Sequence, residues 1–139
     1  MHEHHHEICE MTKDTRKAKD FFKEKLAFTM GPGRLKHMME KHLEEYTLFD
    51  LREYEDYVKG HIPYAVHIPF DQLEEQLVKF SKDKVNILYS YSPLCQRSTK
   101  VAYILAEKGY PVREVIGGFK GWKKRDFDIV ENDVTDYPG

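Results

Sequence analysis

The side chain with the clearest chemistry in this sequence is the thiol of Cys95. It lies in a loop that follows a strand-like run, Val85 to Tyr89, and precedes a helical pattern that begins near Gln96. Backbone N–H groups in such a loop, together with the N-terminus of the next helix, form a concavity that favours anions. A cysteine held there ionises more easily, and the thiolate is the reactive form. We therefore predict a nucleophilic thiol at Cys95.

An anion-binding loop is predicted around this thiol, with Arg97 supplying a fixed positive charge. The residues assigned to it are Ser90, Tyr91, Ser92, Gln96, Arg97, Ser98 and Thr99. The alternative is a buried, inert cysteine that only fills space in the core. The second cysteine, Cys9, lies in a polar N-terminal segment, and a single pair of cysteines does not make a disulfide framework.

The first residues form a tract rich in histidine, with His2, His4, His5 and His6 ahead of Cys9. Imidazole and thiolate groups at such close spacing can capture a transition metal. No second pair of ligands follows at a fixed spacing, so we favour a flexible tail over residues 1–13. We expect neither a metal site nor a cofactor.

Alternating strand and helix patterns position the loop. A helix capped by Asp14 or Thr15 is predicted up to Gly31, and a second helix carries Leu35, Met38 and Met39. Strands are then expected at residues 46–50, 65–68, 85–89 and 112–116, with helical segments at residues 53–58, 71–80, 96–108 and from 117 onward. Such alternation predicts an α/β fold, with a central parallel sheet that has helices on both faces.

The size and charge of the chain indicate how many domains it has and which classes of protein it can belong to. Its 139 residues suit one domain, and 24 acidic against 22 basic residues give a net charge of −2 with the signs interspersed. Nucleic-acid binding calls for a clustered basic face, so we exclude it. We see no apolar run long enough to span a membrane and no secretory leader, and we expect a cytoplasmic protein.

Four stretches of the chain, in order, carry a family resemblance. Phe49-Asp50-Leu51-Arg52-Glu53 resembles an Asp-x-Arg turn, and Gly60-His61-Ile62-Pro63-Tyr64-Ala65 resembles a Gly-His-Ile-Pro-Gly-Ala segment. The strand, loop and helix of residues 85–102 occupy the place of an active-site loop, and residues 117–122 resemble a closing Gly-Gly-x-x-x-Trp. Together these stretches resemble the rhodanese-like family over about residues 31–130.

The resemblance implies a rhodanese-like domain over residues 31–139, preceded by a helical extension over residues 14–30. It implies sulfur transfer, in which a loop cysteine takes up a sulfane sulfur as a persulfide. A small anionic sulfur donor and a thiol or cyanide acceptor are the expected partners, and a protein partner is an alternative. We expect supporting roles for Asp50, Arg52 and His61. Asp50 and Arg52 can pair with each other or with loop carbonyls, and an exposed pair of that kind stabilises little. Because Tyr64 replaces the usual glycine, we expect its backbone to avoid conformations that only glycine tolerates.

One departure from the family pattern matters for function. The family keeps its cysteine at the end of the strand, where this chain has Ser90. Some relatives carry a longer loop, Cys-x-x-x-Pro-x-Cys, which this chain matches except that Ser90 replaces the first cysteine. Either Cys95 acts as the nucleophile, or the domain has lost catalysis and binds an anion or a partner protein through the same loop.

Overall fold

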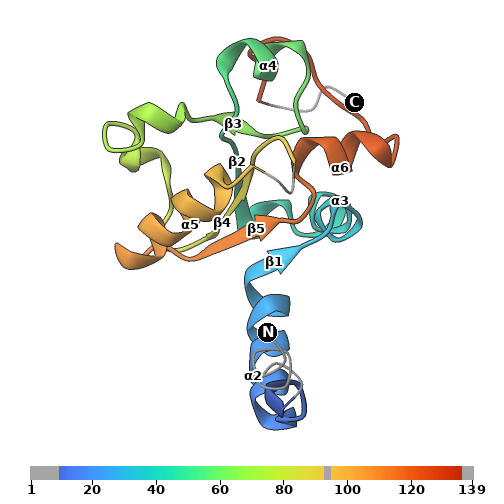
Figure 1. The fold of residues 1–139 in the computed structure, drawn as a ribbon. Helices are drawn as coiled ribbons and strands as arrows, with labels where there is room; N and C mark the ends of the chain where they lie inside the picture. Colours follow the sequence, from blue (N-terminus) through green and yellow to red (C-terminus); the bar gives the residue numbers. More distant parts are fainter. Residues whose placement is uncertain (1–9, 93–94, 136–139) are drawn as a thin grey trace, which may run out of the picture.

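A computed structural model describes residues 10–92 and 95–135 of the chain. Five parallel strands form one sheet in the order β1-β5-β4-β2-β3. The strands are β1 (Thr29–Met30), β2 (Tyr46–Asp50), β3 (Val66–His67), β4 (Val85–Tyr89) and β5 (Val112–Val115). The predicted α/β class and parallel sheet are confirmed, and Figure 1 shows helices lying along the sheet.

The two central strands have apolar side chains on both faces, as parallel sheets require. On β2, Leu48 packs into one buried cluster and Phe49 into the other, and on β4 the same alternation separates Ile87 from Leu88. One cluster lies under α3 (Pro32–Lys41) and α6 (Gly118–Lys124), through residues that include Leu35 and Trp122. The other lies under α5 (Arg97–Glu107), which contributes Val101 and Leu105. The predicted covering of both faces is therefore confirmed.

The N-terminal helix α2 (Thr15–Phe28) begins at the predicted cap, where the Asp14 carboxylate accepts a hydrogen bond from the Lys17 backbone N–H. None of its residues is buried, and it extends away from the sheet (Figure 1). It is followed by β1, a strand that the sequence patterns did not predict. Two residues are too few to show periodicity, and β1 exists because it pairs with β5.

The segment after β3 differs from the prediction. Instead of a helix over residues 71–80, two 3₁₀ turns form, Phe70–Gln72 and Leu77–Lys79. The apolar residues assigned to the helix do face the core: Leu73 and Phe80 are buried, and the Phe80 ring lies 4.4 Å from that of Phe49. Burial of these side chains against β2 determines the path of the segment and overrides its weak helical pattern. Finally, a short helix, α4 (Tyr54–Lys59), joins β2 to β3 and ends at Gly60, as predicted.

Candidate active site

Cys95 lies where β4 gives way to α5, at the carboxyl edge of the parallel sheet. Its sulfur accepts hydrogen bonds from the backbone N–H groups of Arg97 and Tyr91 and from the Ser90 hydroxyl. Its own backbone N–H donates to the Ser92 carbonyl at 3.0 Å, which folds the loop back on itself. Cys95 is a free cysteine of intermediate burial, so it is not the buried cysteine of the alternative.

The net effect of these surroundings is to lower the pKa of the Cys95 thiol. Partial burial acts the other way and is the largest single influence, because a thiolate loses hydration there. The Arg97 N–H, the Ser90 hydroxyl and the Tyr91 N–H together outweigh it, and the Arg97 charge adds to their effect. Hydrogen bonds to the charged form favour ionisation, so the loop favours the thiolate.

Ser90 is almost fully buried beside the sulfur, with 2 % of its surface exposed. Its hydroxyl also lies 3.5 Å from the Cys95 carbonyl oxygen. A hydroxyl has one proton to donate, and a contact of that length is weak. The serine at the strand end and the cysteine five residues later are thus brought into contact by the loop.

The first turn of α6 supports the start of the loop. The Phe119 and Lys120 backbone N–H groups donate to the carbonyl oxygens of Ser90 and Tyr91, each at 2.8 Å. This approach requires Gly118, because a Cβ atom there would lie 2.6 Å from the Ser90 carbonyl oxygen. The backbone of Gly118 also has a φ of 58°, which glycine adopts without strain.

The guanidinium of Arg97 contacts groups outside the predicted loop. It donates to the Glu53 carboxylate at 2.7 Å and to the Leu51 carbonyl at 3.3 Å. Its charge still lowers the pKa of the Cys95 thiol, but as the last of the contributing influences. The backbone N–H of Arg97, rather than its side chain, is the closer partner of the sulfur.

Two further members of the predicted loop, Ser98 and Thr99, direct their hydroxyls to another group. Both donate to the same Glu114 carboxylate oxygen at 2.6 Å. Glu114, Ser98 and Thr99 line a small cavity of about 190 Å³ together with Cys95. Glu114 was missed because it lies on β5, remote in sequence, and no local motif includes it. Gln96 caps α5 and is exposed, and its carbonyl accepts from the Lys100 N–H.

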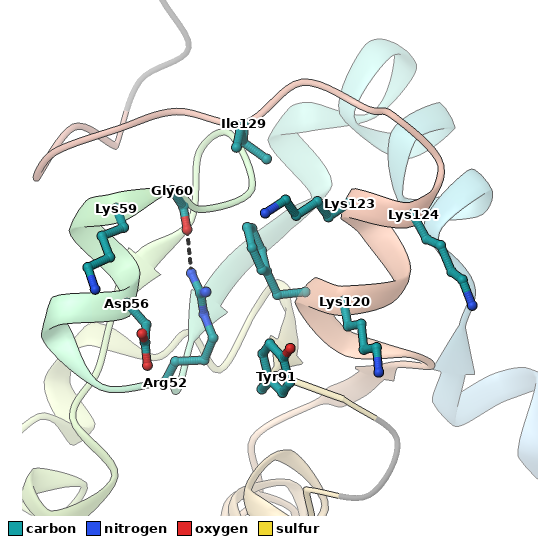
Figure 2. Close-up of a pocket in the computed structure, with 10 residues that line it drawn as sticks. Arg52, Asp56, Lys59, Gly60, Tyr91, Lys120, Lys123, Lys124 and Ile129 are labelled. Atoms are coloured by element: carbon teal, nitrogen blue, oxygen red, sulfur yellow. Dashed lines mark hydrogen bonds between the residues drawn. The ribbon is translucent and has the colours of Figure 1, made fainter.

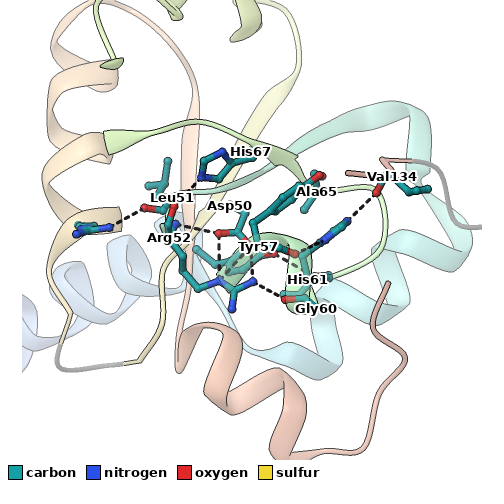
Figure 3. Close-up of polar contacts among 12 residues, drawn as sticks. Asp50, Leu51, Arg52, Tyr57, Gly60, His61, Ala65, His67 and Val134 are labelled. Carbon is teal, nitrogen blue, oxygen red and sulfur yellow. Dashed lines mark hydrogen bonds and ion pairs between the residues drawn. The ribbon is translucent and has the colours of Figure 1, made fainter. Parts of the chain in front are cut away.

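Beneath the loop lies a buried polar network built on Asp50 and Arg52 (Figure 3). The Arg52 guanidinium donates to both Asp50 carboxylate oxygens and to the Gly60 carbonyl, the latter at 2.6 Å. Tyr89, the residue before Ser90, donates its hydroxyl to Asp50 at 2.5 Å. Burial, followed by the Asp50 charge, holds the pKa of Tyr89 well above its usual value, so this hydroxyl keeps its proton.

The expected pairing of Arg52 with Asp50 and with a loop carbonyl is present, but the expected exposure is wrong, because Asp50 is 0 % and Arg52 6 % exposed. Both residues lie under the segment of residues 60–65, which covers them only in the folded chain. A buried pair of this kind is costly to break, since the remaining charge has no water and no partner. The pair couples β2 to the residue that immediately precedes the loop.

The segment that covers the network is held by His61 and turns at Tyr64. The His61 ring is buried, stacks on Tyr57 at 3.9 Å, and its two nitrogens lie 2.8 and 2.7 Å from the Tyr57 and Val134 carbonyl oxygens. Tyr64 has a φ of 71°, contrary to the expectation that its backbone avoids the left-handed region. The chain turns there between Ile62 and Ala65, both fully buried, and their burial imposes the conformation on the tyrosine.

Residues 32–125, more than half of the chain, match the rhodanese-like domain family. The chain belongs to the rhodanese-like family. The four stretches with the family resemblance thus identified it correctly. Residues 1–9 of the predicted tail, with its histidines and Cys9, lie outside the described residues, whereas residues 10–12 are helical. No described helix is long and apolar enough to cross a membrane.

Sulfurtransferases are among the relatives of this rhodanese-like chain. It is 36% identical over 80 residues to the putative sulfurtransferase YtwF of Bacillus subtilis, a match that covers 58% of this chain and 76% of that protein. It is also 36% identical over 75 residues to the thiosulfate sulfurtransferase GlpE of Coxiella burnetii, covering 53% and 68% of the two chains. A third relative, the HTH-type transcriptional regulator Rv0324 of Mycobacterium tuberculosis, is 29% identical over 87 residues. That match covers 63% of this chain but only 38% of the regulator.

The fold is shared with solved structures. The BH2092 protein of Bacillus halodurans superposes with a TM-score of 0.80 at 30% identity, covering 86% of this rhodanese-like chain and 88% of that one. A rhodanese-like domain protein of Staphylococcus aureus gives a TM-score of 0.63 at 26% identity and covers 68% and 90% of the two chains.

Proposed function

We propose that this protein is a sulfurtransferase that carries sulfane sulfur as a persulfide on Cys95. The observation that carries the proposal is the set of three hydrogen bonds that the sulfur accepts from Ser90, Tyr91 and Arg97. A thiolate is the nucleophile that sulfur transfer needs, and this loop favours the thiolate. The relatives named as sulfurtransferases support the same reaction class.

The first step takes sulfur from a small anionic donor such as thiosulfate. The Cys95 thiolate attacks the outer sulfur, the sulfur–sulfur bond of thiosulfate breaks, and sulfite leaves with the bonding electron pair. The product is a persulfide whose terminal sulfur carries the negative charge. The N–H groups that stabilise the thiolate lie at the loop and help to hold this second anion.

The second step passes the terminal sulfur to an acceptor, cyanide or a thiolate. The acceptor attacks that sulfur, and the bond to Cys95 breaks. Thiocyanate or a new persulfide leaves, and the Cys95 thiolate is restored. No redox cofactor is needed, because the sulfur keeps its oxidation state between donor and acceptor. We place the reaction in the cytoplasm, where thiols are kept reduced.

Intact-mass measurement after exposure to thiosulfate tests the proposal. The expected result is a mass increase of one sulfur atom, about 32 Da, that cyanide removes as thiocyanate. The Cys95→Ser variant is expected to show neither the adduct nor thiocyanate formation. The proposal is contradicted if the wild-type protein stays unmodified, or if Cys95→Ser forms as much thiocyanate as the wild type does.

A second candidate is a non-catalytic module that binds an anion or a partner protein through the same loop. It is favoured by Ser90, which stands at the family's cysteine position, and by the match to part of a transcriptional regulator. The Ser90→Cys variant separates the two readings. If wild type is inactive and Ser90→Cys gains strong sulfurtransferase activity, the scaffold is intact and lacks only its nucleophile.

A further inference from the structure

A second, larger cavity of about 690 Å³ lies on the other side of the loop, between α4, α6 and the chain after α6 (Figure 2). Its volume is typical of small-molecule sites. Five of its lining side chains are cationic and one is acidic: Arg52, Lys59, Lys120, Lys123, Lys124 and Asp56. It shares no lining residue with the cavity at Cys95. We call it the cationic cleft.

Three of the lysines belong to one helix. Lys120, Lys123 and Lys124 lie three and four residues apart on α6, and Lys59 lines the cleft from α4. In Figure 2 the side chain of Lys123 points into the cleft, whereas those of Lys59 and Lys124 extend outward from its two sides. None of the four forms an ion pair with a carboxylate in the described part of the chain. Like charges gathered around a concave surface raise the local potential and attract anions.

Arg52 lines the cleft and is held in place by several contacts. Arg52 is 6 % exposed, and its guanidinium packs against the Phe119 ring at 3.9 Å. Its Nε and Nη2 atoms are committed to Asp50 and Gly60, whereas Nη1 donates to no acceptor among the described residues. Since Asp50 balances the Arg52 charge, the positive excess of the cleft comes from the four lysines against Asp56 alone.

Apolar groups complete the wall. Tyr91 is 54% and Ile129 38% exposed, and both line the cleft. An exposed aromatic ring offers a stacking surface to a planar organic group. Lysine ammonium groups bind phosphate as point charges, and an oriented guanidinium nitrogen adds a directional donor.

We propose that the cationic cleft binds a small organic polyphosphate of nucleoside-diphosphate size, with its phosphates among the lysines and its planar group against Tyr91. This inference does not depend on sulfur transfer at Cys95.

Isothermal titration calorimetry with ADP, inorganic pyrophosphate and adenosine tests the proposal. We expect ADP to bind more tightly than pyrophosphate, and adenosine to give no binding. Rising salt should weaken ADP binding, because it screens the exposed lysines. The Cys95→Ser variant should bind ADP as wild type does, whatever the outcome for sulfur transfer.

A triple variant, Lys120→Gln, Lys123→Gln and Lys124→Gln, should weaken ADP binding by roughly tenfold or more. These side chains are exposed, so the variant should retain the wild-type unfolding midpoint. The matched control is Lys17→Gln, Lys19→Gln and Lys23→Gln, which removes the same charge from α2 and should leave ADP affinity unchanged.

Three outcomes overturn the proposal. The first is the absence of binding heat with both ADP and pyrophosphate at millimolar concentration. The second is an equal loss of affinity in the α2 control, which means that net charge rather than the cleft attracts the anion. The third is tighter binding of a hexaglutamate peptide than of ADP, which identifies the cleft as a docking surface for acidic peptides.

Discussion

At the scale of single residues, Ser90 and Cys95 form one unit. The serine occupies the strand end, and the loop returns the cysteine so that its sulfur accepts a hydrogen bond from the serine hydroxyl. At the strand end, where the family keeps its cysteine, this chain therefore has a hydrogen-bond donor, the Ser90 hydroxyl. We propose that Ser90 stabilises the thiolate in this arrangement and that Cys95 is the nucleophile.

The Ser90→Ala variant tests this arrangement. Removing the hydroxyl takes away one of the three donors to the sulfur, so the pKa of the Cys95 thiol should rise toward its ordinary value. Because only the thiolate reacts, the rate of iodoacetamide alkylation near pH 7 should fall severalfold and recover at high pH. The control is Ser92→Ala, whose hydroxyl makes no hydrogen bond within the described residues. An alkylation profile unchanged by Ser90→Ala contradicts the assignment.

At the scale of elements, the docking of α6 onto the loop sets the site. Two backbone N–H groups of α6 hold the Ser90 and Tyr91 carbonyls, and the contact is possible only because Gly118 has no side chain. On the other side, the Asp50–Arg52–Tyr89 network ties β2 to β4 immediately before the loop. The loop is thus fixed at its first residues by groups from three elements.

The Gly118→Ala variant should lower both the stability of the protein and the reactivity of Cys95. Its Cβ atom would lie within 2.9 Å of the backbone of Ser90 and Tyr91, and its positive φ is strained for alanine. We expect the free energy of unfolding to fall by about 2–3 kcal/mol in urea titrations, with slower Cys95 alkylation in the folded protein. The control is Gly33→Ala in α3, where the added Cβ makes only an ordinary 3.5 Å contact and alanine favours the helix. Equal effects of the two substitutions would contradict the proposed docking.

At the scale of the whole molecule, the two buried clusters belong to the sheet and its covering helices, and α2 contributes to neither. The extension still exposes Phe21, Phe22, Leu26 and Phe28. Its described links to the body include the two hydrogen bonds that Arg113 donates to the Leu26 and Thr29 carbonyl oxygens.

Removal of residues 1–28 tests whether the sheet and its covering helices are stable without α2. The truncated chain keeps β1, which pairs with β5, and should unfold cooperatively with a free energy within about 1 kcal/mol of the full chain. Urea titrations at two protein concentrations measure this. A larger loss that depends on concentration would instead show that α2 is covered by another copy of the chain.

The sequence alone determined the α/β class, the family and the position of the thiol, because these follow from local patterns. Strands β2 and β4 matched the predicted ranges, since a run of apolar residues between turn signals needs no distant partner to be recognised. The start of α5 directly after Cys95 and Gln96 was predicted for the same reason.

Only the tertiary structure decided which groups meet the sulfur and which charges meet each other. Arg97 pairs with Glu53, and Ser98 and Thr99 donate hydrogen bonds to Glu114, because those carboxylates come from segments distant in sequence. The burial of Asp50 and Arg52, and the gathering of Lys59 with the lysines of α6, also require the packed chain. A residue's spacing shows which face of its own element it occupies, whereas its partners depend on contacts between elements distant in sequence.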